Sequence, residues 1–396
     1  MIRFAQVLRL VVIGLVVAPS PAECAAFLKL PVNGYLAGKP ISTTVDSALA
    51  QYYLENFLSR KNAIPLGQER PLDKRVAEIE ERFGERPLDW LSLRELSRQT
   101  SPDFATLFFI KQSLSKQLNA QRQSAYWQEL ARIRSSPGQN HRGDLVRAAL
   151  RQYKFLFIPG FHYLSDPSSG ADFYNQRQFF GHLGLRVELA GIQEDGTIEE
   201  NAGIIADIVR AESKSNSSLI LVSTSKGGPE TALALGKLLD PNETASVKAW
   251  LSVGGLIQGT FLADHVMGWP KSWLAQIALS YAGVDARSLP GMTTIASRAR
   301  MKQIGLPRHI FALQFVGAPL SGDIADDVRH RYLALRKYGP NDGLTLLADE
   351  LLPNGITIIE PGLDHFYRDP EIDLKSLAIA NVVADELARQ AVSSEK

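Results

Sequence analysis

Cysteine and net charge are both nearly absent from this chain of 396 residues. Cys24 is the only cysteine, so the folded protein is expected to contain no intrachain disulfide, no thiol nucleophile and no cysteine-bound metal. The 43 Lys and Arg residues balance 42 Asp and Glu residues. This near-neutrality gives no bulk attraction to nucleic acid or to an anionic membrane. Stability must come from the apolar core, for which an apolar fraction of 45% is ample.

The sequence signatures of most bound groups are also missing. The chain has no phosphate-cradling glycine-rich loop, no HExxH pair and no paired cysteine or histidine spacing typical of a metal site. No cofactor and no metal ion are therefore expected.

The first 22 residues differ from the rest of the chain. Arg3 and Arg9 precede the apolar run Leu10–Ala18, which is about half of the roughly 20 residues needed to cross a bilayer. Prolines and small residues follow as far as Ala22. This order is typical of a signal peptide, so residues 1–22 are expected to direct export to the periplasm or the medium.

Residues 27–150 show mostly helical periodicity and carry no chemical motif. Apolar residues recur there at intervals of three and four positions, which is typical of helices. The predicted helices are Val45–Leu58, Leu72–Phe83, Phe104–Leu118 and Ala125–Ile133. We expect a helical N-terminal extension that packs on the rest of the chain, caps a cleft or offers a surface to a partner.

Residues 151–396 are expected to form a second, α/β domain, because short apolar strands alternate there with helical segments. The predicted strands are Phe155–Ile158, Leu185–Leu189, Leu219–Val222, Val247–Val253, His309–Val316 and Ile356–Ile359. A helix with a capping-box start at Thr197 lies between the second and third strands. The alternation predicts an α/β fold with a doubly wound, mainly parallel sheet.

The most informative segment follows the third predicted strand, where Ser223-Thr224-Ser225-Lys226-Gly227 leads into a helix. This is the layout of a nucleophile elbow, the G-x-S-x-G turn that raises a serine above the edge of a sheet. Small residues are needed two positions before and after the nucleophile, and Ser223 and Gly227 supply them. Ser225 is therefore the candidate nucleophile, against the alternative of an ordinary loop that happens to contain serines.

A serine nucleophile needs a base, which a third group must orient. In hydrolases with this turn, the order along the chain is serine, carboxylate, histidine. His365 follows the last predicted strand in a loop expected at the carboxyl edge of the sheet, so it is the candidate base. His265, beside Asp264, is its rival.

Asp342 is the candidate for the third group. It lies in the turn-rich segment 339–343, and a helix and the last strand fit between it and His365. The same Asn-Asp-Gly residues also suit a plain turn. Asp364 and Asp323 are the alternative carboxylates.

Acyl transfer also needs N–H groups directed at the developing oxyanion. The elbow offers the N–H of Lys226, and Gly160 lets the chain fold back so that the N–H of Phe161 can face the cleft. The Lys226 side chain is expected either to reach solvent or to bind an anionic group of the substrate.

Residues 254–304 form an insertion between the fourth and fifth predicted strands. Its large apolar residues are Leu256, Ile257, Phe261, Leu262, Met267, Trp269, Trp273, Leu274, Ile277 and Tyr281. An insertion at this place lies near the carboxyl ends of the strands, where α/β proteins bind ligands. It is interpreted as an apolar lid that forms an acyl-chain pocket, or as a cap that packs on the body.

Four motifs together resemble the α/β-hydrolase superfamily, and within it the lipase- and esterase-like branch. They are Pro159-Gly160-Phe161, the elbow 223–228, Asn341-Asp342-Gly343 and Leu363-Asp364-His365. The resemblance covers residues 154–366. The family pattern differs at two positions, with His in place of Pro159 and Gly in place of Ser223.

The resemblance implies a catalytic triad of Ser225, Asp342 and His365, with oxyanion N–H groups from Phe161 and Lys226. It also implies a lipid or small-molecule ester as substrate and contact with a lipid interface through the lid. The expected function is hydrolysis of an apolar carboxylic ester through an acyl-enzyme. An acyltransferase with the same triad and a non-catalytic binding protein with this fold are the alternatives.

Overall fold

The computed structural model describes residues 29–59, 71–135, 145–268 and 286–394. The expected signal peptide 1–22, Cys24 and part of the expected lid, including Trp269, Trp273 and Tyr281, lie outside the described residues. Among the described residues, no helix combines the length and the apolar character that crossing a membrane would require.

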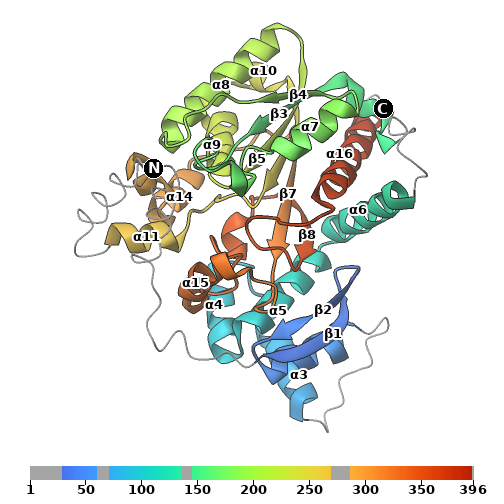
Figure 1. Ribbon diagram of the computed structural model, residues 1–396, viewed down its shortest axis with the longest axis vertical. Helices are drawn as coiled ribbons and strands as arrows, with labels where there is room; N and C mark the ends of the chain where they lie inside the picture. The colour runs from blue at the N-terminus through green and yellow to red at the C-terminus, as the bar shows by residue number, and fades with distance from the viewer. Residues whose placement is uncertain (1–28, 60–70, 136–144, 269–285, 395–396) are drawn as a thin grey trace.

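A six-stranded parallel sheet forms the centre of the molecule (Figure 1). Its strand order is β4-β3-β5-β6-β7-β8, and every neighbouring pair is parallel. The strands are β3 (Tyr153–Ile158), β4 (Arg186–Leu189), β5 (Ser218–Thr224), β6 (Val247–Val253), β7 (Phe311–Ala318) and β8 (Ile356–Pro361). The predicted parallel sheet is therefore confirmed, with strand ends displaced by two residues at most.

Helices cover both faces of this sheet, because alternate residues of its strands are buried on opposite sides. In β5, Ile220 and Val222 pack in the apolar cluster beneath α6 (Gln117–Ser135), α7 (Tyr174–His182) and α16 (Ile372–Ser394). Leu219 and Leu221 pack on the other face against α8 (Ile198–Lys214) and α9 (Gly227–Leu233). The fold is thus doubly wound, as the sequence predicts.

The N-terminal residues form four longer helices and one hairpin, and the periodicity predicts neither the hairpin nor α4 (Trp90–Gln99). The helices are α3 (Pro71–Phe83), α4 (Trp90–Gln99), α5 (Pro102–Ser115) and α6 (Gln117–Ser135); a short α2 (Ala48–Tyr52) continues as a π-helical turn, η1 (Tyr53–Leu58). The hairpin pairs β1 (Leu30–Leu36) with β2 (Lys39–Val45). Its turn residues, Ala37 and Gly38, both have positive φ, which suits a two-residue hairpin turn.

These N-terminal elements pack directly on the sheet. Val316 and Ala318 of β7 and Ile359 of β8 share one buried apolar cluster with the hairpin and with α3–α5. In Figure 1, α6 lies beside α16 on one face of the sheet. Two α6 side chains also bind the outer edge of β8: Asn119 accepts from the Thr357 N–H, and Gln123 both donates to and accepts from the Ile359 backbone.

The remaining helices connect the strands of the sheet. The longer ones are α11 (Phe261–Gly268), α14 (Thr294–Met301) and α15 (Asp326–Leu335), with short α10 (Pro241–Thr244) and α13 (Leu289–Met292). One-turn or π-helical segments are η3 (Ala148–Gln152), η4 (Pro167–Ser169), η5 (Ala234–Leu238), η6 (Ala286–Ser288), η7 (Arg336–Tyr338) and η8 (Leu347–Glu350). α11, η6, α13 and α14 belong to the insertion between β6 and β7.

Candidate active site

Ser225 occupies the sharp turn between β5 and α9. Its φ is +53°, a left-handed backbone conformation that is uncommon outside glycine. The backbone holds the turn tightly, because the Ser225 carbonyl accepts hydrogen bonds from Gly228 N at 3.0 Å and Leu256 N at 2.9 Å. Such a strained position is typical of a residue presented for chemistry.

Small residues surround this turn because other segments approach it closely. A Cβ on Gly227 would lie 2.8 Å from the Pro159 carbonyl oxygen, and one on Gly160 would lie 3.2 Å from the Ser225 Cβ. Ser223 replaces the usual glycine without leaving a buried hydroxyl unpaired, since its Oγ accepts from the Trp250 indole at 2.8 Å.

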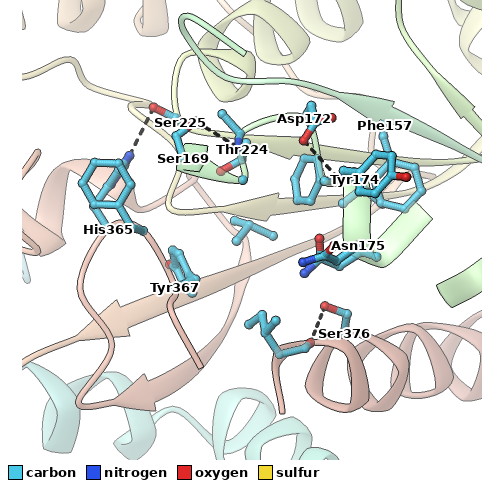
Figure 2. A pocket seen from close by; sticks show the side chains of 18 of the residues that line it. Phe157, Ser169, Asp172, Tyr174, Asn175, Thr224, Ser225, His365, Tyr367 and Ser376 are labelled. Carbon is cyan, nitrogen blue, oxygen red and sulfur yellow. Dashed lines mark hydrogen bonds between the residues drawn. The ribbon is translucent and has the colours of Figure 1, made fainter. Parts of the chain in front are cut away.

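The structure brings together the serine, histidine and carboxylate expected from the sequence. His365 Nε2 lies 3.2 Å from Ser225 Oγ, and His365 Nδ1 lies 2.5 Å from Asp342 Oδ2. Figure 2 shows His365 reaching from its loop toward Ser225. All three side chains are buried, with Asp342 only 1% exposed.

Asp342 is held in place by its own turn. Its Oδ1 accepts from the N–H groups of Leu344 at 2.8 Å and Thr345 at 2.7 Å. Its carbonyl accepts from the His365 N–H at 3.0 Å. The segment is therefore a tight turn that also presents a carboxylate to the imidazole.

Tyr367 holds the histidine loop against β7, and it is not among the residues expected at the site. Its hydroxyl donates to the Phe315 carbonyl at 2.9 Å and accepts from Gly317 N at 2.8 Å, both in β7. A tyrosine two residues after a candidate base is the one signal available in the sequence.

The alternative residues are engaged elsewhere. His265 is exposed on α11, and the Asp264 carboxylate accepts from the N–H and the hydroxyl of Thr294 at the start of α14. The Asp364 carboxylate accepts from the N–H groups of Ala325 and Phe366. Asp323 accepts from Leu320 N at 3.0 Å. Burial raises the pKa of both Asp364 and Asp323.

The two candidate oxyanion donors lie at the ends of β3 and β5. Within the described part of the chain, neither the Phe161 N–H nor the Lys226 N–H donates a hydrogen bond to another residue. Both groups are therefore available to a ligand.

The Lys226 side chain does neither of the things expected of it. It is 1% exposed, and its Nζ forms an ion pair with the fully buried Glu230 at 2.7 Å. Asn201 Nδ2 donates to the same Glu230 oxygen at 2.8 Å. Burial raises the pKa of Glu230 to about 7, while the Lys226 ammonium opposes that rise. The partner of Lys226 is therefore a buried acid of α9, the helix that begins directly after Lys226. The i,i+4 spacing of Lys226 and Glu230 is the sequence signal that indicates this pair.

A cavity of about 1080 Å³ opens in front of Ser225 and His365. Its apolar lining comes from the sheet, from α7 and the loop before it, and from α16: Phe155, Phe157, Phe173, Phe180, Ile220, Val222, Ile379 and Val383. In Figure 2, Phe157, Asn175 and Ser376 surround this space, with Ser225 and His365 to one side.

The described residues of the insertion take no part in this cavity. None of the described residues in 254–268 and 286–304 lines it. Leu256, Ile257 and Met292 are instead buried in the core beneath α8 and α9. Phe261 stacks on Tyr338 with ring centroids 4.1 Å apart. For these residues, the expectation that the insertion forms an acyl pocket is therefore wrong. They pack on the body of the protein, among other apolar side chains.

The described residues contain no group of three or more His, Cys, Asp or Glu side chains arranged to hold a metal ion.

Comparison with known proteins gives likeness to solved structures only. No protein-family model matches the chain, and no curated protein matches it in sequence. A metagenomic carboxyl esterase is 22% identical, over 63% of this chain and 78% of its own, with a TM-score of 0.45. The mature Bacillus licheniformis lipase BlEst2 is 18% identical, over 61% of this chain and 92% of its own, also with a TM-score of 0.45.

A phospholipase from Legionella pneumophila, PlaB, is 14% identical over 60% of this chain and 62% of its own, with a TM-score of 0.43. The assignment of a fold rests on the chain's own geometry: a doubly wound parallel sheet, a positive-φ serine directly after β5 and a histidine loop after β8. The chain thus has the doubly wound, α/β-hydrolase-like fold expected from its sequence.

Proposed function

We propose that this protein is a serine hydrolase of apolar carboxylic esters. The observation that carries the proposal is the continuous contact from Ser225 Oγ to His365 Nε2, at 3.2 Å, and from His365 Nδ1 to Asp342 Oδ2, at 2.5 Å. Nucleophile, base and orienting acid stand in the order that this chemistry needs.

In the proposed reaction, His365 takes the proton of Ser225 as its oxygen attacks the ester carbonyl. Asp342 orients the imidazole and stabilises the imidazolium that forms. The N–H groups of Phe161 and Lys226 bind the oxyanion of the tetrahedral intermediate. The protonated His365 then gives its proton to the leaving alcohol. Water, activated by the same imidazole, releases the acid from the acyl-enzyme.

The cavity supports an apolar acyl group as the part of the substrate that is bound. Aromatic and aliphatic side chains dominate its lining, and a volume of about 1080 Å³ has room for a long chain. Export through residues 1–22 is part of the same proposal.

The decisive experiment compares the purified wild type with Ser225→Ala on p-nitrophenyl esters. Loss of the nucleophile is expected to reduce kcat by about a millionfold, to background. His365→Ala should behave alike, and activity should fall on acidification because a protonated imidazole cannot accept the serine proton. Undiminished hydrolysis by Ser225→Ala would refute the assignment.

A fluorophosphonate probe separates an enzyme from a non-catalytic binding protein. The wild type should be labelled at Ser225, and Ser225→Ala should not. Product analysis with an added alcohol separates a hydrolase from an acyltransferase, because a hydrolase releases mainly the free acid and an acyltransferase forms mainly the new ester.

A further inference from the structure

Arg331 lines the same cavity as Ser225 and His365. It lies on α15, and its guanidinium carbon is 5.4 Å from the centroid of the Phe366 ring. That ring is in turn 6.0 Å from the imidazole of His365. The guanidinium is therefore two ring contacts away from the candidate base.

Among the described residues, Arg331 has no ion-pair partner. Its Nε is buried without a hydrogen-bond acceptor there, and its Nη2 makes only one long bond, to the Asp327 carbonyl at 3.4 Å. The neighbouring Arg368 differs, since it holds both carboxylate oxygens of Asp327 at 2.7 and 2.6 Å. The carboxylate of the residue that Arg331 contacts is thus already engaged by another arginine.

This leaves a partly buried cation with most of its donors unused. A guanidinium has five N–H donors, and burying a charge without a partner is costly. Burial lowers the pKa of Arg331, and Arg368 lowers it further, against the opposing effect of Asp327, Asp364 and Asp342. The Asp364 carboxylate is engaged by two backbone N–H groups. An anion in the cavity would supply the missing partner.

We propose that Arg331 binds an anionic group of the substrate, a carboxylate or a phosphate close to the ester bond. The planar guanidinium suits either anion, because two parallel N–H groups match two oxygens. The acyl chain then enters the apolar part of the cavity. This inference rests on the proposed ester hydrolysis. Arg331, and not Lys226, would then bind the anionic group of the substrate.

Matched pairs of hexanoyl esters test the proposal and identify the anion. One pair is hexanoyl-glycerol phosphate and hexanoyl-glycerol; the other is O-hexanoyl glycolate and O-hexanoyl ethylene glycol. For each pair, the selectivity is the ratio of kcat/KM for the anionic ester to that for the neutral one. In the wild type we expect this ratio to exceed one for at least one pair. The pair with the higher ratio identifies the anion that Arg331 binds as a phosphate or a carboxylate.

Arg331→Met should lower that ratio roughly ten- to a hundredfold, the effect of losing a charged hydrogen-bonding group. Arg331→Lys should retain part of the ratio, because the charge remains but the paired donors are lost. Arg329→Met is the matched control: it removes the same charge from α15, but Arg329 pairs with the exposed Asp326 and does not line the cavity.

A wild type without preference for either anionic ester would overturn the proposal, as would an equal change of the ratio in Arg331→Met and Arg329→Met. Either result would leave the ester hydrolase function intact if the neutral esters are still cleaved with dependence on Ser225. Failure of the proposed function itself would appear as hydrolysis that survives Ser225→Ala.

Discussion

At the scale of single residues, the geometry of the elbow depends on the absence of a side chain at Gly227. We predict that Gly227→Ala lowers the free energy of unfolding by about 1–3 kcal/mol, because its Cβ would meet two backbone carbonyl oxygens, of Pro159 at 2.8 Å and of Ile158 at 2.9 Å. Denaturant unfolding measures the change, and kcat should fall with it, since the backbone must shift beside Ser225.

Gly203→Ala is the control for this substitution. Gly203 lies inside α8, and a Cβ there would meet nothing within 4 Å. Alanine in an open helical position should raise the free energy of unfolding, by up to about 1 kcal/mol. Equal effects of the two variants would contradict the steric account.

Glu350 gives the protein a pH-dependent stability. Both of its carboxylate oxygens are buried, with no hydrogen-bond partner among the described residues. Burial, and then the charges of Asp342 and Asp349, raises its pKa well above the ordinary 4.5. Below pH 4.5 the acid is protonated in both the folded and the unfolded chain, so its contribution to stability is complete there.

As the pH rises above 4.5, the unfolded chain ionises at this residue while the folded chain stays protonated. The free energy of unfolding should therefore fall by up to about 1.4 kcal/mol per pH unit until the raised pKa is reached. We predict that Glu350→Gln removes this loss. Urea unfolding of the wild type and of Glu350→Gln at pH 5, 6.5 and 8 measures this difference. If the free energy of unfolding changes equally with pH in both proteins, Glu350 is not protonated in the folded state.

At the scale of secondary-structure elements, α6 protects the edge strand β8. Gln123 donates to the Ile359 carbonyl at 3.0 Å and accepts from the Ile359 N–H at 2.8 Å. An uncovered strand edge is a site for aggregation. The N-terminal residues thus complete the sheet, although their sequence carries no chemical motif.

We predict that Gln123→Leu lowers the free energy of unfolding by about 2–4 kcal/mol, because a buried backbone donor and acceptor lose their partners. Chemical denaturation gives the value. Gln128→Leu on the same helix is the control, since Gln128 makes only an exposed bond to Ser124. An unchanged stability of Gln123→Leu would mean that the edge of β8 does not depend on α6.

At the scale of the whole molecule, the cavity draws its apolar lining from the sheet, from α7 and the loop before it, and from α16. We predict that Ala380→Trp, which fills the cavity from α16, shortens the acyl chain that can be bound. Loss of about four buried methylene groups corresponds to roughly 3 kcal/mol, or about a hundredfold in kcat/KM for a dodecanoyl ester. Hydrolysis of an acetyl ester should change far less.

A series of p-nitrophenyl esters of increasing length measures this effect. Ala388→Trp is the control, because Ala388 is exposed on the same helix and does not line the cavity. A uniform loss across all chain lengths would argue against this cavity as the acyl site.

The sequence alone determined the features that depend on local chemistry. Alternating strands and helices predicted the parallel sheet, because burial on both faces requires continuous apolar strands. The small residues around Ser225 predicted the sharp turn, and the loop positions of Asp342 and His365 made them candidates. Two N-terminal elements were not predicted: α4, and the hairpin, whose short alternating pattern lies in a region expected to be helical.

The tertiary structure decided everything that depends on distant partners. In the folded chain, Lys226 pairs with Glu230. Asp342, and not Asp364 or Asp323, is the carboxylate beside His365. The cavity is lined by α16, and by none of the described residues of the insertion. The identity of a residue fixes the charge and shape of its side chain. The groups that desolvate it or neutralise it come from strands and helices far along the chain, and only folding brings them together.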